Sequence, residues 1–254
     1  MRIRMLGTGY GECKLKKRTS KEYRGRGGVL IDDTLLIDAP HDLFAVADEL
    51  GISDMLKTVT DVVISHSHVG HFSPEVIDKM ARKRRVRVYG SREVLVQLSD
   101  NPNIIKYEIG VFMQFAVGAY YVATLPSNHS TANLSEECFN FLITGDKCLL
   151  YALDGGWING RAWNVLKLVK LDAVICDAAL ELEEASERNL YHNDLGTLAR
   201  IKSIYEQNGV ANEKTRFILS HVPTDKKREI HDELSPIAAK MGMTVAYDGY
   251  FARI

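Results

Sequence analysis

The sequence is poor in the features that define several protein classes. Its 254 residues include four cysteines, and none of them stands in a CxxC pair, so a disulfide framework is not indicated. No run of 18 apolar residues is present to span a membrane. The first residues lack the apolar core of a secretion signal, and the formal net charge of −1 gives no general attraction to nucleic acid. We therefore expect a cytoplasmic globular protein.

Histidine is also scarce, yet three of the eight histidines lie within six residues. His66, His68 and His71 follow the apolar run 62–64. On an extended strand end, residues i and i+2 point the same way, so His66 and His68 can bind one ion, and the following turn brings His71 from the other side. Imidazole nitrogen suits zinc, manganese, iron or nickel. The cluster favours a metal site over three separately hydrogen-bonded loop histidines.

The order of apolar segments indicates an α/β protein. No linker or repeat divides the chain, so we expect a single domain over residues 1–254. Its fold is predicted to be a four-layer αβ/βα sandwich, in which two mixed β-sheets pack together and helices flank them. The expected strands are 2–6, 28–31, 34–38, 61–65, 86–89, 111–115, 119–124, 141–144, 148–153, 173–176, 215–219 and 244–247. The expected helices are 41–50, a segment from Ser73, a short segment from Ser91, 194–208 and a segment capped by Thr224.

Three more potential metal ligands follow apolar strands. His129 comes after the strand at 119–124, Asp154 after 148–153 and His221 after 215–219. Strand ends in layered α/β folds hold ligand-binding loops rigidly. A single histidine or aspartate in such a place is commonly structural. Together with the triplet, the three residues predict one metal centre.

The order of these residues resembles that of the metallo-β-lactamase superfamily of hydrolases, over nearly the whole chain. The superfamily pattern His-x-His-x-Asp-His, then His, Asp and His, is similar to residues 66–71, His129, Asp154 and His221. Leu6-Gly7-Thr8-Gly9, Cys13 and the segment 35–43 resemble the phosphoribosyl 1,2-cyclic phosphate phosphodiesterases, which are themselves similar to ribonuclease Z. The resemblance implies the metallo-β-lactamase fold and a metal-dependent phosphodiesterase that acts on a small cyclic or nucleotide-like phosphate.

The resemblance also implies a set of metal ligands. A first Zn²⁺ or Mn²⁺ would be held by His66, His68, His129 and Asp154. A second would be held by His71 and His221, with Asp154 as the bridge between the two ions. The chain departs from the pattern at Gly70, where the superfamily has an aspartate. We therefore expect a second site that is weakened or empty, and one or two ions in the chain.

Catalytic roles are implied for two residues. Asp154 is expected to act at the metal centre, where a divalent ion supplies an activated water. His192 stands where these phosphodiesterases carry an extra histidine, and we expect it to protonate the leaving oxygen. The alternative for His192 is a helix-start residue without a catalytic task. Asp38 and Asp177 end apolar strands, and they are expected either to orient histidines or to act as caps of turns and helices.

A basic segment runs from Lys14 to Arg26 and includes Lys16, Lys17, Arg18, Lys21 and Arg24. Most of these side chains fit a solvated loop. We expect only Arg24 or Arg26 to bind a substrate phosphate, because arginine offers paired donors to phosphate oxygens.

Other functions stay open at this stage. The same site suits hydrolysis of a lactone, a thioester or a β-lactam-like bond. Gly70 favours, as a further alternative, a catalytically impaired metal-binding or sensing homologue. The expected partner is a small phosphorylated substrate, and a homodimer is possible by the resemblance. Nucleic acid and membranes are not expected partners, because the net charge is near zero and apolar spans are absent.

Overall fold

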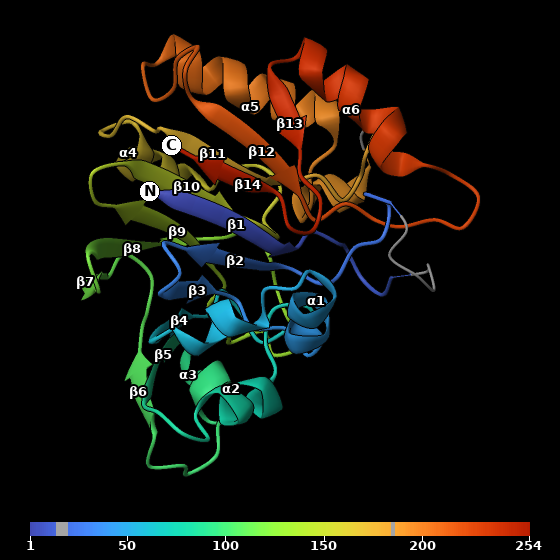
Figure 1. The fold of residues 1–254 in the computed structure, drawn as a ribbon. Helices are drawn as coiled ribbons and strands as arrows, with labels where there is room; N and C mark the ends of the chain where they lie inside the picture. The colour runs from blue at the N-terminus through green and yellow to red at the C-terminus, as the bar shows by residue number, and fades with distance from the viewer. Residues whose placement is uncertain (14–19, 184–185) are drawn as a thin grey trace.

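Two mixed β-sheets lie face to face in the middle of the molecule (Figure 1). The computed structural model describes residues 1–13, 20–183 and 186–254. Within these residues each sheet has seven strands. The first and last strands pair with each other, which brings the two ends of the chain side by side.

The first sheet has the strand order β14-β1-β2-β3-β4-β5-β6. Its strands are β1 (Arg2–Gly7), β2 (Gly28–Ile31), β3 (Leu35–Ile37), β4 (Asp61–Val63), β5 (Val86–Gly90), β6 (Ile104–Glu108) and β14 (Phe251–Arg253). Strands β3 to β6 run parallel, and the others pair antiparallel. The turn between β2 and β3 contains Asp32 and Asp33 with φ of 44° and 63°. Positive φ at both residues is typical of a tight hairpin turn.

The second sheet has the order β13-β12-β11-β10-β9-β8-β7. Its strands are β7 (Gln114–Val117), β8 (Tyr120–Pro126), β9 (Phe139–Thr144), β10 (Cys148–Ala152), β11 (Ala173–Asp177), β12 (Arg216–Ser220) and β13 (Met243–Val245). Strands β10 to β13 run parallel, and β7 to β10 form antiparallel hairpins.

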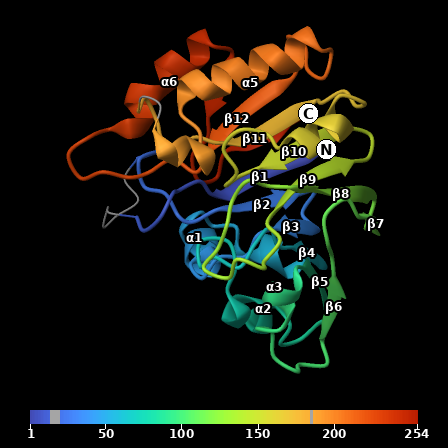
Figure 2. The ribbon, with the colours of Figure 1, turned by 180° about the vertical axis from the view of Figure 1, so that it is seen from behind.

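Helices cover the outer face of each sheet (Figure 1, and from behind in Figure 2). The first sheet is covered by α1 (Leu43–Glu49), η1 (Ser53–Lys57), α2 (Pro74–Met80) and α3 (Arg92–Leu95). The second sheet is covered by α4 (Gly160–Leu166), α5 (Leu195–Gln207) and α6 (Ile230–Lys240), and η2 (Glu187–Leu190) precedes α5. The four-layer αβ/βα sandwich is therefore confirmed. Among the described residues, no helix is long and apolar enough to cross a bilayer.

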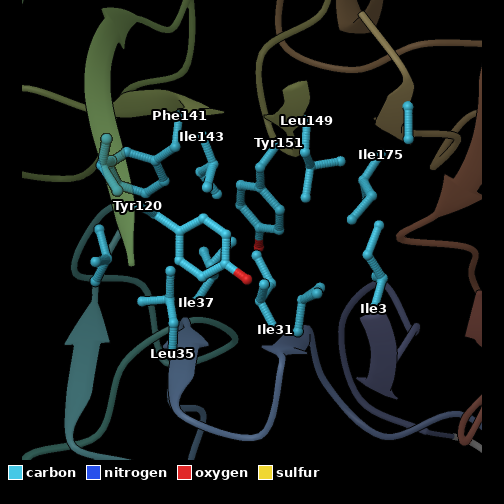
Figure 3. Close-up of a cluster of buried hydrophobic side chains, with 14 of the residues drawn as sticks. Ile3, Ile31, Leu35, Ile37, Tyr120, Phe141, Ile143, Leu149, Tyr151 and Ile175 are labelled. Atoms are coloured by element: carbon cyan, nitrogen blue, oxygen red, sulfur yellow. The ribbon is translucent and has the colours of Figure 1, made fainter. Parts of the chain in front are cut away.

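An apolar layer fills the space between the sheets (Figure 3). Ile3, Ile31 and Ile37 extend from the first sheet toward Phe141 and Tyr151 of the second. Burial of such side chains contributes about 1.5–3 kcal/mol each. The tight packing fixes the relative position of the strand ends that carry the predicted site.

Some elements differ from the prediction. Strands β6 and β14 and helix α4 were not predicted, because β6 is largely exposed and β14 has three residues. The helix expected after Thr224 begins only at Ile230. Its first turn is capped by Glu22, whose carboxylate accepts from the backbone N–H groups of His231 and Asp232 at 2.9 and 3.1 Å.

Candidate metal centre

The predicted site residues follow the ends of strands in both sheets. Asp38 follows β3, the histidine triplet follows β4, and Asp154 and His221 follow β10 and β12. Asp38, Asp154 and His221 have φ of 60°, 50° and 60°. Left-handed backbone at a residue other than glycine costs of order 1–3 kcal/mol, and such strain gathers at functional sites. The turns at these residues place the side chains of Asp38, Asp154 and His221 near His71 and near one another.

His66, His68 and His129 form one group of nitrogen donors. His66 Nε2 lies 3.1 Å from His68 Nδ1, and His129 Nε2 lies 3.0 Å from the same atom. A tetrahedral ion with bonds of about 2.0–2.1 Å holds its ligands about 3.3–3.4 Å apart, and an octahedral ion holds them closer. The three nitrogens therefore have the spacing of one shared ion.

Asp154 is the centre of the second group. Its Oδ2 lies 2.6 Å from His71 Nε2 and 3.5 Å from His66 Nε2, and its Oδ1 lies 2.7 Å from His221 Nε2. The Asp154 carboxylate thus adjoins both groups of histidines. The resemblance implies a bridging role for Asp154, and the carboxylate lies between the two groups.

The charge states also suit a metal ion. Burial lowers the pKa of His129 to about 4, and burial together with the His71 charge lowers the pKa of His66 well below its usual value. Both rings are therefore neutral at pH 7, as ligands must be. Burial alone would lower the pKa of His71, but Asp154 and Asp38 raise it to about 10. The carboxylates thus favour a positive charge at this position.

Two buried atoms test whether an ion fits. In the described part of the chain, His71 Nε2 and Asp154 Oδ1 are buried without a well-aligned hydrogen bond, although each lies within 2.7 Å of an oppositely charged or polar group. Buried polar atoms without a well-aligned partner commonly mark the place of an ion or a water. A shared cation would satisfy both atoms, so the donor set fits a divalent ion.

Asp38 orients His71, which agrees with one of the two roles expected for it. Asp38 Oδ2 lies 2.7 Å from His71 Nδ1, and it also accepts from the Tyr151 hydroxyl at 2.6 Å. The contact leaves Nε2 of His71 directed at Asp154. A carboxylate behind a ligand histidine fixes its ring and raises its basicity.

Asp177 holds His192 in the same way. Its Oδ2 lies 2.8 Å from His192 Nδ1, and Asp154 Oδ1 lies 3.3 Å from that nitrogen. Burial would lower the pKa of His192, but the hydrogen bond to Asp177 raises it above the usual value. His192 is therefore brought to the candidate metal centre, and Asp177 favours its protonated form.

Gly70 leaves space where the superfamily pattern has an aspartate. A Cβ atom at this position would meet only Cδ of Arg26, at 4.0 Å. The Arg26 guanidinium bonds the Gly11 carbonyl at 3.3 Å and His41 Nδ1 at 2.9 Å. Arg26 thus lies beside the candidate centre, as a phosphate contact would require.

Arg24 does not fit its prediction. Its side chain is 1% exposed, and its guanidinium donates to Thr8 Oγ1 at 2.8 Å and to the Ala246 carbonyl at 2.7 Å, and contacts His231 Nδ1 at 3.1 Å. These contacts contradict a role in binding substrate phosphate. The basic residues Lys14, Lys16, Lys17 and Arg18 lie outside the described residues.

A cavity of about 900 Å³ adjoins the centre. Tyr10 lines it and contacts the rings of His192 and His221 edge-on, with centroids 4.9 and 5.1 Å apart. Arg188, Lys226 and Arg228 also line the cavity. The sequence analysis missed Tyr10, although the glycine-rich turn that holds it was evident.

No protein-family model and no curated protein matches this chain in sequence. Several solved structures, however, are similar to it in fold. The metallo-β-lactamase fold protein YhfI from Bacillus subtilis has a TM-score of 0.75 at 15% identity, covering 99% of this chain and 98% of its own. The short form of human tRNase Z has a TM-score of 0.72 at 14% identity, covering 100% and 99%. A diphosphatase from the PhnP family has a TM-score of 0.69 at 17% identity, covering 100% and 97%.

These likenesses extend over the full length of both chains. At such low identity they define the fold and leave the reaction open. The chain has the metallo-β-lactamase fold. The candidate ligand histidines and Asp154 lie close together at the strand ends and are buried or partly buried.

Proposed function

We propose that the protein is a metal-dependent hydrolase and that its substrates are phosphodiesters. The observation that carries the proposal is the convergence of two histidine groups on Asp154, next to a protonatable His192. Two of the similar structures, the PhnP-family diphosphatase and tRNase Z, bear names that indicate cleavage of bonds to phosphate, which supports this choice among hydrolases.

The residues divide into two candidate metal positions. His66, His68 and His129 would hold one Zn²⁺ or Mn²⁺ with Asp154, and His71 and His221 would share Asp154 at the other. A bound divalent ion supplies a water of lowered pKa and positive charge beside the phosphoryl oxygens. The second position would have three protein ligands, because Gly70 offers none.

The protein side chains would move the proton and place the substrate. His192 would give its proton to the leaving oxygen, and Asp177 would keep the ring oriented and its pKa raised. Tyr10 and the cavity beside it would receive the rest of the substrate. The cavity is large enough for a nucleotide-sized molecule, since ligand sites commonly have 300–1,000 Å³.

The test is hydrolysis of bis(p-nitrophenyl) phosphate by protein that has been stripped with a chelator and reloaded with Zn²⁺ or Mn²⁺. We expect turnover that returns with the metal and is absent from the His66→Ala/His68→Ala variant. If the reloaded protein hydrolyses this ester no faster than the variant does, the proposed phosphodiesterase activity is disproved. Parallel assays with a lactone, a thioester and a β-lactam would then identify hydrolysis of another bond.

A further inference from the structure

The loop of the first two histidines alternates serine with histidine, as Ser65-His66-Ser67-His68. A carboxylate binds each serine through both its backbone N–H and its hydroxyl. Asp38 accepts from Ser65 N at 2.7 Å and from Ser65 Oγ at 2.9 Å. Glu136 accepts from Ser67 N at 2.8 Å and from Ser67 Oγ at 2.6 Å. His66 is therefore held between two similar two-point contacts.

The two carboxylates come from different parts of the fold. Asp38 follows β3 of the first sheet, whereas Glu136 lies between β8 and β9 of the second sheet. The segment of Glu136 also carries His129. Glu136 consequently joins the loop of His66 and His68 to the loop of His129. All three histidines are in the group of nitrogen donors described above.

The burial of Glu136 requires an explanation. The residue is 8% exposed, while its neighbour Glu137 is exposed. Within the described residues Glu136 forms no ion pair, and its further hydrogen bond comes from Ser91 Oγ at 3.4 Å. Burying a charge away from water is costly unless hydrogen bonds compensate. Both oxygens accept short hydrogen bonds from Ser67, so the main effect of the buried carboxylate is to position that residue.

We propose that Glu136 is a positioning residue for the metal centre, which sets the spacing of His66, His68 and His129 by holding Ser67. This inference rests on the metal-binding part of the proposed function and is independent of the substrate. Carboxylates that orient metal ligands typically account for 10- to 100-fold in metal affinity. Ser67 and Glu136 act through the same contact.

The test is a zinc titration of chelator-treated protein against a chromophoric competitor, with the thermal midpoint of the metal-free protein measured in parallel. Glu136→Ala and Ser67→Ala should each weaken zinc binding about 10- to 100-fold. The double variant should be little worse than Glu136→Ala alone, because Glu136→Ala already loses both arms of the contact. Ser67→Ala removes only the hydroxyl arm, so it keeps the proposal testable if Glu136→Ala does not fold.

Two control variants test whether the effect comes from holding Ser67, rather than from the negative charge of Glu136 or from any change in this segment. Glu136→Gln keeps an acceptor for Ser67 N and offers a donor to Ser67 Oγ, so its zinc affinity should stay within about 3-fold of the original. Glu137→Ala alters the adjacent exposed carboxylate, which accepts from Val111 N at 3.1 Å, and should leave zinc affinity unchanged.

Three results would overturn the positioning role. The first is an unchanged zinc affinity in both Glu136→Ala and Ser67→Ala. The second is a loss of zinc affinity in the double variant equal to the sum of the two single losses. The third is a loss of zinc affinity in Glu136→Gln as large as in Glu136→Ala. If the unaltered protein binds no zinc, the metal centre itself fails. If the zinc results are as expected but bis(p-nitrophenyl) phosphate is not hydrolysed, only the proposed reaction fails.

Discussion

The hydroxyl of Tyr151, on β10 of the second sheet, donates to Asp38 at the end of β3 in the first sheet, over 2.6 Å. The contact crosses the apolar layer between the sheets, and Figure 3 shows the Tyr151 hydroxyl directed from its strand toward the first sheet. Asp38 in turn contacts His71 Nδ1 and holds Ser65. Packing of the two sheets is thereby connected to the orientation of a candidate metal ligand.

Tyr151→Phe should lower both stability and metal affinity. The variant keeps the ring in the core but removes one hydrogen bond from a buried carboxylate, which costs about 1.5–3 kcal/mol of unfolding free energy. We expect a weaker zinc affinity as well, by about 10-fold. Urea unfolding and zinc titration measure the two effects. Tyr121→Phe, at an exposed position on β8, is the control, and equal stability of the two variants would refute the connection.

The pH dependence of the metal-free protein should follow from His71. Asp154 and Asp38 overcome the effect of burial and raise its pKa to about 10 in the folded state, whereas the unfolded value is about 6.5. A raised pKa in the folded state stabilises the protein fully below about pH 6.5, and this contribution is lost as the pH rises toward about 10. Urea unfolding of chelator-treated protein at pH 6.5, 8 and 9.5 should show the decline.

Two comparisons assign the decline to His71. Zinc replaces the proton, so zinc-loaded protein should decline less over the same range and should release protons on binding. In the His71→Gln variant the glutamine cannot be protonated, so its unfolding free energy should decline much less between pH 6.5 and 9.5. Equal stability of the metal-free protein at pH 6.5 and 9.5 would contradict the assignment.

The layers and the histidine positions could be predicted because local pattern encodes them. Apolar strands that end in His129, Asp154 or His221 are visible in the sequence, and so is the triplet. Tyr151 and Glu136 were not predicted, because their partners lie over 60 residues away in sequence. Arg24 was one of two candidates for binding a substrate phosphate, because arginine offers paired donors to phosphate oxygens. Its burial depends on Thr8, Ala246 and His231, which only the fold brings together.

Arg24→Met should destabilise the protein without weakening the metal centre. Burial lowers the Arg24 pKa to about 10, and the guanidinium satisfies Thr8 Oγ1 and the Ala246 carbonyl. Removing a charged donor from buried hydrogen-bond partners costs about 1.5–3 kcal/mol. Arg24→Lys should restore little, because an ammonium group lacks the fork of donors. Urea unfolding gives the cost, and unchanged stability with lost turnover would instead favour phosphate binding.

Gly70→Asp should strengthen the second metal position. The nearest atom to its new Cβ is Arg26 Cδ at 4.0 Å, so the side chain has space. A fourth protein ligand beside His71, His221 and Asp154 should raise the metal content from about one toward two ions per chain. Elemental analysis after dialysis measures the ratio. An unchanged ratio would show that the aspartate side chain does not reach the ion, and a lost first ion would show that the native site is arranged differently.

His192→Ala should affect turnover according to the leaving group. The proton on His192 matters where the departing oxygen is a poor leaving group, such as a ribose hydroxyl, and general acid catalysis typically contributes 10²- to 10⁴-fold. The p-nitrophenolate ion departs without protonation, so bis(p-nitrophenyl) phosphate should lose far less. The ratio of kcat for a 2′,3′-cyclic nucleotide to kcat for the nitrophenyl ester measures the difference.

Asp177→Asn should give a smaller loss of the same kind, because Asp177 holds His192 Nδ1 at 2.8 Å. An equal loss on both substrates would assign His192 to metal or substrate binding, which a zinc titration of the variant would separate.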